Sequence, residues 1–122
     1  IPAWRVNAQT ELLKRGEPAQ KYLFSRLNQG ELSTASQTWA LWTLGASTAE
    51  VSIDQYLSGI LADSEATRNA RIQALRILTY RIRQFEQCTT LPDAVLPLLT
   101  SEDARLRHAA VQAIWQAEQK QW

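Results

Sequence analysis

The sequence contains few of the residues that break, bend or cross-link a fold. It has four glycines, four prolines and a single cysteine, Cys88, among 122 residues. A β-sandwich of this length usually needs more turn residues, so the shortage argues against an all-β fold. One cysteine excludes an internal disulfide and a cysteine-cluster metal site. No apolar run approaches the roughly 20 residues that a membrane-spanning helix requires, so we expect no transmembrane segment.

An excess of charge of one sign is also missing. Thirteen basic residues are balanced by twelve acidic ones, and the formal net charge is +1. Proteins that bind nucleic acids usually carry a clear basic excess, because phosphate neutralisation supplies much of their affinity. The apolar fraction of 45% is ordinary for a globular chain and excludes general disorder. The composition favours a folded domain that binds no nucleic acid tightly.

The apolar residues recur at helical spacing along the whole chain. We expect seven or so α-helices and no sheet. Gly16, Gly30 and Gly45 are placed to end helices, and Ser33 or Thr34 to cap one. The expected helices are residues 4–16, 17–29, 34–45, 50–62, one opened by residues 63–65 and ending near 84, 92–100, and one opened by residues 101–103.

Several local details follow from the same pattern. Tyr22, Leu23 and Leu27 are expected to form a buried stripe on the second helix. Ser64 and Ser101 each precede a basic, alanine-rich helix, whose free N–H groups their hydroxyls can cap. Pro97 has no backbone N–H, so the helix that contains it should be short or kinked.

A small-then-large core pattern recurs in the longer helices. It appears as Ala40-Leu41, as Ile-Gln-Ala-Leu at residues 72–75 and as Val-Gln-Ala-Ile at residues 111–114, with spacings of 34 and 39 residues. Such periods are typical of stacked helical hairpins. The fold class expected is therefore an all-α, right-handed α–α superhelix of about three to four hairpins. The side chains expected to be buried between its layers are Leu41, Trp42, Leu75 and Ile114.

These motifs resemble a known family. Residues 63–75 and 101–114 are similar to the HEAT-repeat pattern of an acidic turn, basic residues and an Ala-Leu core. Residues 4–16 and 39–45 resemble the HEAT region of bacterial, planctomycete-type membrane-bound dehydrogenases and c-type haem-binding proteins.

The resemblance implies one armadillo-like HEAT domain over residues 1–122, cut from a larger multidomain protein in a periplasmic or extracytoplasmic compartment. The Cys-x-x-Cys-His motif of the haem domain is absent, so the redox chemistry transfers to no residue here.

The chemically reactive residues give no catalytic constellation. His108 is the only histidine, and a dyad with Cys88 would have no third group to orient it. We therefore predict no catalytic, cofactor-binding or metal-ligating residue, and no small-molecule substrate. The densest run of basic residues is expected to form a solvated face that pairs locally with Glu65. Surface pairing of this kind contributes roughly 0–1 kcal/mol to stability. The members of this run are Arg68, Arg71, Arg76, Arg81 and Arg83.

The function expected is a non-catalytic scaffold that contacts another protein or another domain of the same chain. The shorter helices of the hairpins should line its interaction surface, with Lys21, Ser25, Asn28, Gln55 and Ser58 exposed on it.

The alternative is a HEAT-like DNA glycosylase or nucleic-acid-binding module. It would stack bases on Trp39 and Trp42 and use Asp54, whereas packing between layers is the simpler role for both indoles. A bilin-attaching lyase subunit is a third, weaker possibility.

Overall fold

The computed structural model describes residues 17–30, 32–47, 51–85 and 91–119. Five α-helices and one 3-10 helix make up these ranges, which contain no strand. The expected all-α fold is confirmed. The first expected helix, near Trp4, and Cys88 lie outside the described residues. The chain divides into two compact units, residues 1–48 and 49–122, and each is described by itself.

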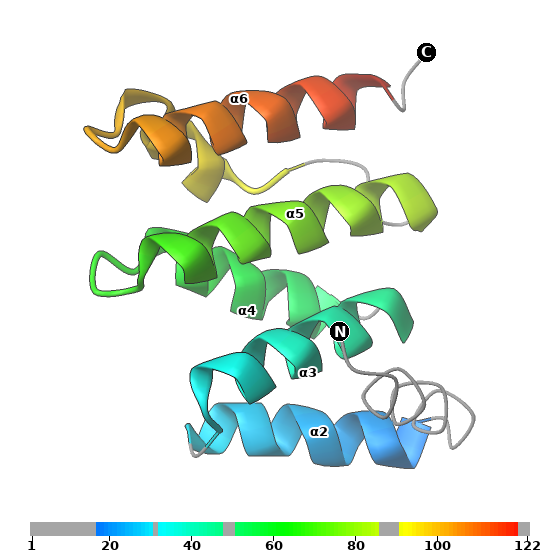
Figure 1. Ribbon diagram of the computed structural model, residues 1–122. Helices are drawn as coiled ribbons and strands as arrows, with labels where there is room; N and C mark the ends of the chain where they lie inside the picture. The colour runs from blue at the N-terminus through cyan, green and yellow to red at the C-terminus, as the bar shows by residue number, and fades with distance from the viewer. Residues whose placement is uncertain (1–16, 31, 48–50, 86–90, 120–122) are drawn as a thin grey trace. The chain divides into compact units, whose positions relative to one another are not determined.

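The first unit contains a helical hairpin made of α2 (Glu17–Gln29) and α3 (Thr34–Ser47), which pack against each other (Figure 1). On α2, Leu23 and Leu27 are buried as expected. Gly30 ends the helix in the left-handed region, with φ of 69°, and its N–H donates to the Leu27 carbonyl at 3.1 Å. The expectation for Tyr22 was wrong: it is 66% exposed, because it lies about 100° around the helix from Leu23.

Helix α3 begins where the sequence indicated and ends later. The Ser33 hydroxyl accepts the Ser36 N–H at 3.3 Å, which makes Ser33 the N-cap. Gly45 does not stop the helix, which continues to Ser47. Among the described residues only Gly30 has a positive φ, so Gly45 does not adopt the left-handed conformation that ends helices. Gly45 is buried within the helix instead.

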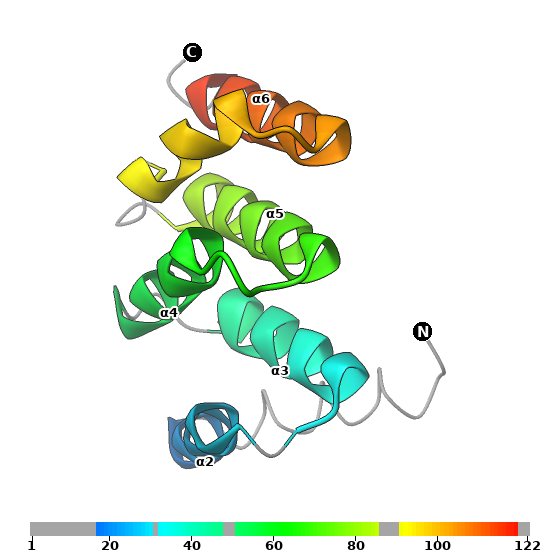
Figure 2. The ribbon, with the colours of Figure 1, turned by 90° about the vertical axis from the view of Figure 1, so that its left-hand side faces the viewer.

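The second unit consists of α4 (Val51–Ala62), α5 (Arg68–Gln84), η1 (Asp93–Thr100) and α6 (Ala104–Gln119). Figures 1 and 2 show two layers, one formed by α4 and η1 and the other by α5 and α6. Each long helix packs against its neighbour in the same layer and against the short helix that precedes it. The most deeply buried apolar side chains of this unit are Ile53, Leu57, Leu61, Ala74, Leu75, Ile77, Ile82, Val95 and Ala110.

The caps of α5 and α6 differ from those expected. Thr67, rather than Ser64, caps α5, because its hydroxyl accepts the Ala70 N–H at 3.1 Å. Asp103, rather than Ser101, caps α6 by accepting the N–H groups of Arg105 and Leu106. The residues before both caps form turns, so each helix begins later than the serines suggest.

Pro97 shapes the short element before α6. Residues 93–100 form a 3-10 helix, as expected of a short helix that cannot use the proline nitrogen as a donor. Val95 and Leu98 are its buried side chains. Of the helices described, none is long and apolar enough to cross a membrane.

The core expectation was half right. Leu41 and Leu75 are buried, with 5% and 1% of their surfaces exposed. Trp42 and Ile114 are only half-buried. The register between the helices also differs from the one expected. The caps Thr67 and Asp103 lie 36 residues apart, whereas the matching Gln-Ala pairs suggested 39. Ile114 therefore corresponds to Leu78 and not to Leu75.

The caps define a common register for all three long helices. Seven residues after its N-cap, each helix has a fully buried alanine, 0% exposed: Ala40 in α3, Ala74 in α5 and Ala110 in α6. A residue this small lets neighbouring helices approach closely. The next position holds Leu41, Leu75 and Val111, which are the large aliphatic partners of the alanines.

Candidate functional site

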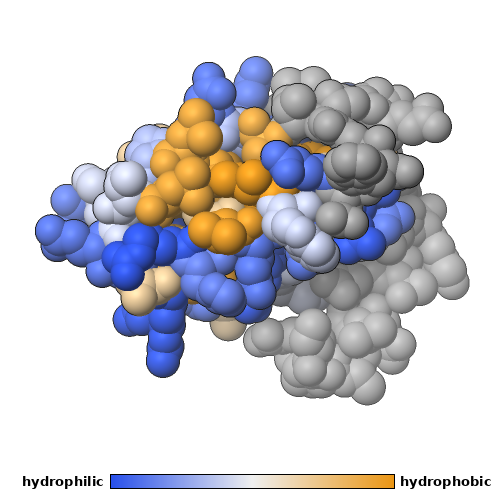
Figure 3. All heavy atoms as spheres, turned by 90° about the horizontal axis from the view of Figure 1, so that it is seen from above, coloured by the Kyte–Doolittle hydropathy of each residue, from blue (hydrophilic) through white to orange (hydrophobic). Residues whose placement is uncertain are grey.

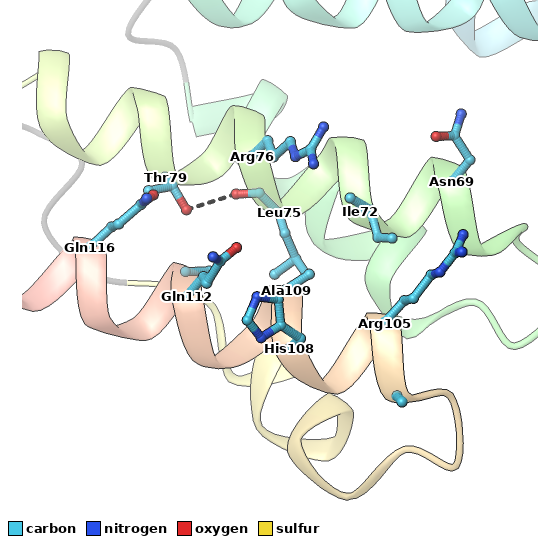
Figure 4. Close-up of a pocket in the computed structure, with 12 residues that line it drawn as sticks. Asn69, Ile72, Leu75, Arg76, Thr79, Arg105, His108, Ala109, Gln112 and Gln116 are labelled. Atoms are coloured by element: carbon cyan, nitrogen blue, oxygen red, sulfur yellow. Dashed lines mark hydrogen bonds between the residues drawn. The ribbon is translucent and has the colours of Figure 1, made fainter.

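A groove runs between α5 and α6 on the surface of the second unit (Figure 4). Its volume is about 550 Å³. Leu75, Ala109 and Ala113 form its apolar floor, and Leu75 points from α5 toward α6. Thr79 is not available to a ligand as a donor, because its hydroxyl donates to the Leu75 carbonyl at 2.8 Å. The small alanines of α6 leave the space that the groove occupies.

Apart from Thr79, the polar side chains of the groove are not engaged with the rest of the protein. Among the described residues, none of them makes a side-chain hydrogen bond or ion pair. They are Asn69 and Arg76 of α5 and Arg105, His108, Gln112 and Gln116 of α6. No aspartate or glutamate lines the groove, so its fixed charge is positive. Five of the six side chains are well exposed, and Gln116 is half-buried. The donor groups of these six side chains are therefore not occupied by acceptors of the protein itself.

The outer face of α6 is a second candidate surface. We use this term for the exposed side chains Arg107, Val111, Trp115 and Glu118, which lie on the side of α6 opposite its buried residues. Val111 is 55% and Trp115 62% exposed. Viewed onto α6, the unit shows an apolar patch framed by polar residues (Figure 3), and Leu96 of η1 is a further exposed apolar side chain at 58%. Large exposed apolar side chains that gather on one face indicate a contact surface.

An ion pair inside the second unit joins α4 to α5. The Arg81 Nε atom donates to the Asp54 Oδ1 atom at 2.7 Å, and the Arg81 side chain is 0% exposed. The guanidinium also lies 5.2 Å from the centre of the Phe85 ring, within range of a cation–π interaction. The expectation that Arg81 belongs to a solvated face was wrong. It missed that Arg81 lies on the same side of α5 as Ala74 and Ile77, which are fully buried.

The other arginines of α5 behave more nearly as expected, although Glu65 is not their partner in the contacts described. Arg68 pairs with Asp103 at 3.2 Å across the ends of α5 and α6. Arg71 donates to the Asp63 carbonyl. Both contacts are exposed, so they contribute little to stability.

The predicted interaction residues fall in both units. Lys21 and Ser25 are exposed on α2, and Gln55 is exposed on α4. Ser58 is half-buried and donates to the Asp54 carbonyl at 2.8 Å. The side chain of Asn28 lies outside the description. The five residues are divided between two units that are described separately, and their role stays a prediction.

The residues of the nucleic-acid alternative are also divided. Trp39 and Trp42 are half-buried on α3, in the first unit. Asp54 is on α4, in the second unit, and its carboxylate accepts the hydrogen bond from the buried Arg81. A catalytic base needs a lone pair directed at the substrate, and this carboxylate is directed at a cation. Base stacking on the two indoles stays an untested prediction.

The sequence did not lead us to predict the groove, because we expected the interaction surface on the shorter helices. A signal was present in the long ones. Polar residues recur at helical spacing at Asn69, Arg76, Arg105, Gln112 and Gln116. All of them except Arg76 are next to an alanine, which is too small to fill the space between helices. His108 was noted only as a possible catalytic residue. Among the described residues, no group of three side chains is placed to hold a metal ion.

No family model matches this chain, and neither does any curated protein or solved structure. The resemblance to HEAT repeats therefore remains a prediction that rests on the motifs and on the helical register.

Proposed function

We propose that the chain is a non-catalytic helical-repeat scaffold, and that the outer face of α6 holds a further amphipathic helix in the way that α5 holds α6. One observation supports this most strongly. The position after the buried alanine is buried in α3 and α5, where Leu41 is 5% and Leu75 is 1% exposed. In α6 the same position is Val111, and it is 55% exposed. The repeated packing position is therefore largely exposed in α6, whereas it is buried in the other two long helices.

Further features of α5 and α6 support the same register. Thr67 and Asp103 both accept the N–H three residues ahead of them. Arg71 and Arg107, each four residues after its cap, both donate to a carbonyl of the preceding turn. These agreements fit two copies of one structural unit, α4–α5 and η1–α6, as in a solenoid in which each repeat contacts its neighbours.

The apolar side chains of the outer face give the proposal an energetic basis. Complete burial of a large apolar side chain stabilises a protein by about 1.5–3 kcal/mol. Val111 and Trp115 are a little over half exposed, so roughly half of that amount remains available in each. Thr79, which corresponds to Trp115 in the 36-residue register, is 4% exposed in α5. A helix on the outer face of α6 would bury Val111 and Trp115 in the way that α6 buries Leu75 and Thr79.

An extended chain tests the proposal. A second copy of residues 84–119 is appended directly after residue 119, which preserves the 36-residue spacing of the caps. If the outer face of α6 accepts a helix, the appended copy folds onto it. The urea unfolding curve, followed by far-UV circular dichroism, then shifts to a higher midpoint with a steeper slope, because more surface is buried.

Val111→Asp is the matched control. In the original chain it alters an exposed position and should change stability by no more than about 0.5 kcal/mol. In the extended chain it should remove the gain, because the charge would be buried without a partner. An extension that leaves the unfolding curve unchanged contradicts the proposal, as does a Val111→Asp effect of equal size in both chains.

A second extended chain distinguishes an error in the repeat register from an outer face of α6 that does not bind a helix. His108→Ile, Val111→Leu and Trp115→Thr together give α6 the side chains of Ile72, Leu75 and Thr79. If only this chain accepts the appended copy, the repeat register is right, but the natural outer face of α6 is not a site for a helix of this kind.

A further inference from the structure

We infer that the groove between α5 and α6 binds an extended acidic peptide segment, with its carboxylates held by Arg76 and Arg105 and an aliphatic side chain seated on the floor between them. This site is separate from the outer face of α6. The inference does not require that α6 hold another helix, so either can fail without the other.

The charge of the groove selects the ligand class. Arg76 and Arg105 come from opposite walls, both are exposed, and neither has an ion-pair partner in the part of the chain that is described. By contrast, Arg68 and Arg71, which do not line the groove, are engaged with Asp103 and Asp63. A guanidinium can hold a carboxylate with two parallel hydrogen bonds. Two uncommitted guanidiniums therefore favour a ligand with two carboxylates.

The remaining groups of the groove favour a peptide over a nucleic acid. Asn69, Gln112 and Gln116 carry amides, each of which can both donate to and accept from a peptide backbone. Figure 4 shows Arg105, Gln112 and Gln116 extending from α6 toward α5 along the length of the groove. The apolar floor suits an aliphatic side chain, whereas a phosphate backbone would find two arginines and a chain with a net charge of only +1.

His108 provides a direct spectroscopic probe of the site. It lines the groove and is the only histidine in the chain, so its ring protons give one resolvable set of NMR signals. The probes are short, N-acetylated and C-amidated peptides in which two glutamates flank one leucine, with the spacing between the glutamates varied. The glutamine analogue of each peptide removes the charge and keeps the shape. An oligothymidylate of the same net charge serves as the nucleic-acid probe.

At fixed pH and low salt, at least one glutamate peptide should shift the His108 signals saturably, and its glutamine analogue should not. Arg76→Gln and Arg105→Gln should each weaken binding about tenfold or more, as expected for a lost charge-assisted contact. Arg83→Gln is the matched control, because it removes the same charge from an exposed position of α5 outside the groove. It should change the dissociation constant by less than about twofold, the screened effect of a distant surface charge.

Three results would overturn the inference. The first is that no peptide of the series shifts the His108 signals. The second is that Arg83→Gln weakens binding as much as the groove variants do, which would show attraction to the general charge of the protein. The third is tighter binding of the oligothymidylate than of any peptide, which would assign the groove to nucleic acid. Unchanged far-UV circular dichroism of the three variants establishes that each is folded.

Discussion

The ion pair between Asp54 and Arg81 gives the sharpest prediction about stability, because its two members are unequally buried. Arg81 is 0% exposed and Asp54 is 27% exposed. Removing the carboxylate in Asp54→Ala leaves a guanidinium inside the unit without its ionic partner. Loss of one member of a buried pair typically destabilises a protein by about 3–5 kcal/mol, and we expect a value in this range.

Substitution of the other member of the ion pair should cause a smaller loss of stability. Arg81→Met keeps most of the side-chain volume and removes the buried charge, while Asp54 can still reach water. The expected loss is about 1–2 kcal/mol, of the order of a cation–π interaction with Phe85. The double variant Asp54→Ala with Arg81→Met should resemble Arg81→Met alone. It should therefore be about 2–3 kcal/mol more stable than Asp54→Ala, because no unpaired charge remains.

Urea unfolding followed by far-UV circular dichroism measures all four proteins of this cycle. The order of stability expected is wild type, then Arg81→Met together with the double variant, then Asp54→Ala. A double variant that is destabilised by the sum of the single losses would refute the reasoning, because it would show that the two side chains act independently. Equal losses in the two single variants would refute the argument from unequal burial.

Substitutions at three further positions test the packing and the caps of the second unit by the same unfolding assay. Leu75→Ala should cost about 2–5 kcal/mol, since Leu75 is 1% exposed, and a loss below about 0.5 kcal/mol would mean that the wrong face of α5 is buried. Ala110→Leu should destabilise by about 1–3 kcal/mol through overpacking at a fully buried alanine, and a neutral result would contradict the close approach of α6 to its neighbours. Asp103→Ala should cost about 1–2 kcal/mol, mostly by loss of the α6 N-cap, whereas Asp103→Asn should keep most of the cap and separate it from the exposed ion pair with Arg68.

The all-α class and the positions of the helices could be predicted because they depend on local signals. Helical spacing of apolar residues and Gly30 gave the bounds of α2, and apolar spacing gave those of α4. Pro97 correctly indicated a short irregular helix. The errors at Ser64 and Ser101 arose because several neighbouring residues can cap a helix. Only the conformation of the turn decided between them and Thr67 or Asp103.

The candidate sites depend on tertiary contacts, which the sequence pattern did not contain. The burial of Arg81 requires Asp54, 27 residues earlier, to lie beside it on α4. The groove requires α5 and α6 to pack with a particular offset, and the repeated Gln-Ala pairs suggested an offset three residues too long. With that offset Ile114 corresponds to Leu75, and the pattern does not predict that Val111 is exposed. The caps, which became visible only in the structure, corrected the register.

The most direct test of the scaffold proposal is a crystal structure of the chain extended by a second copy of residues 84–119. The proposal predicts that the appended long helix lies on the outer face of α6, with Val111 and Trp115 buried beneath it as Leu75 and Thr79 are buried beneath α6. An ordered appended copy that packs elsewhere, with Val111 and Trp115 still exposed to solvent, would contradict it.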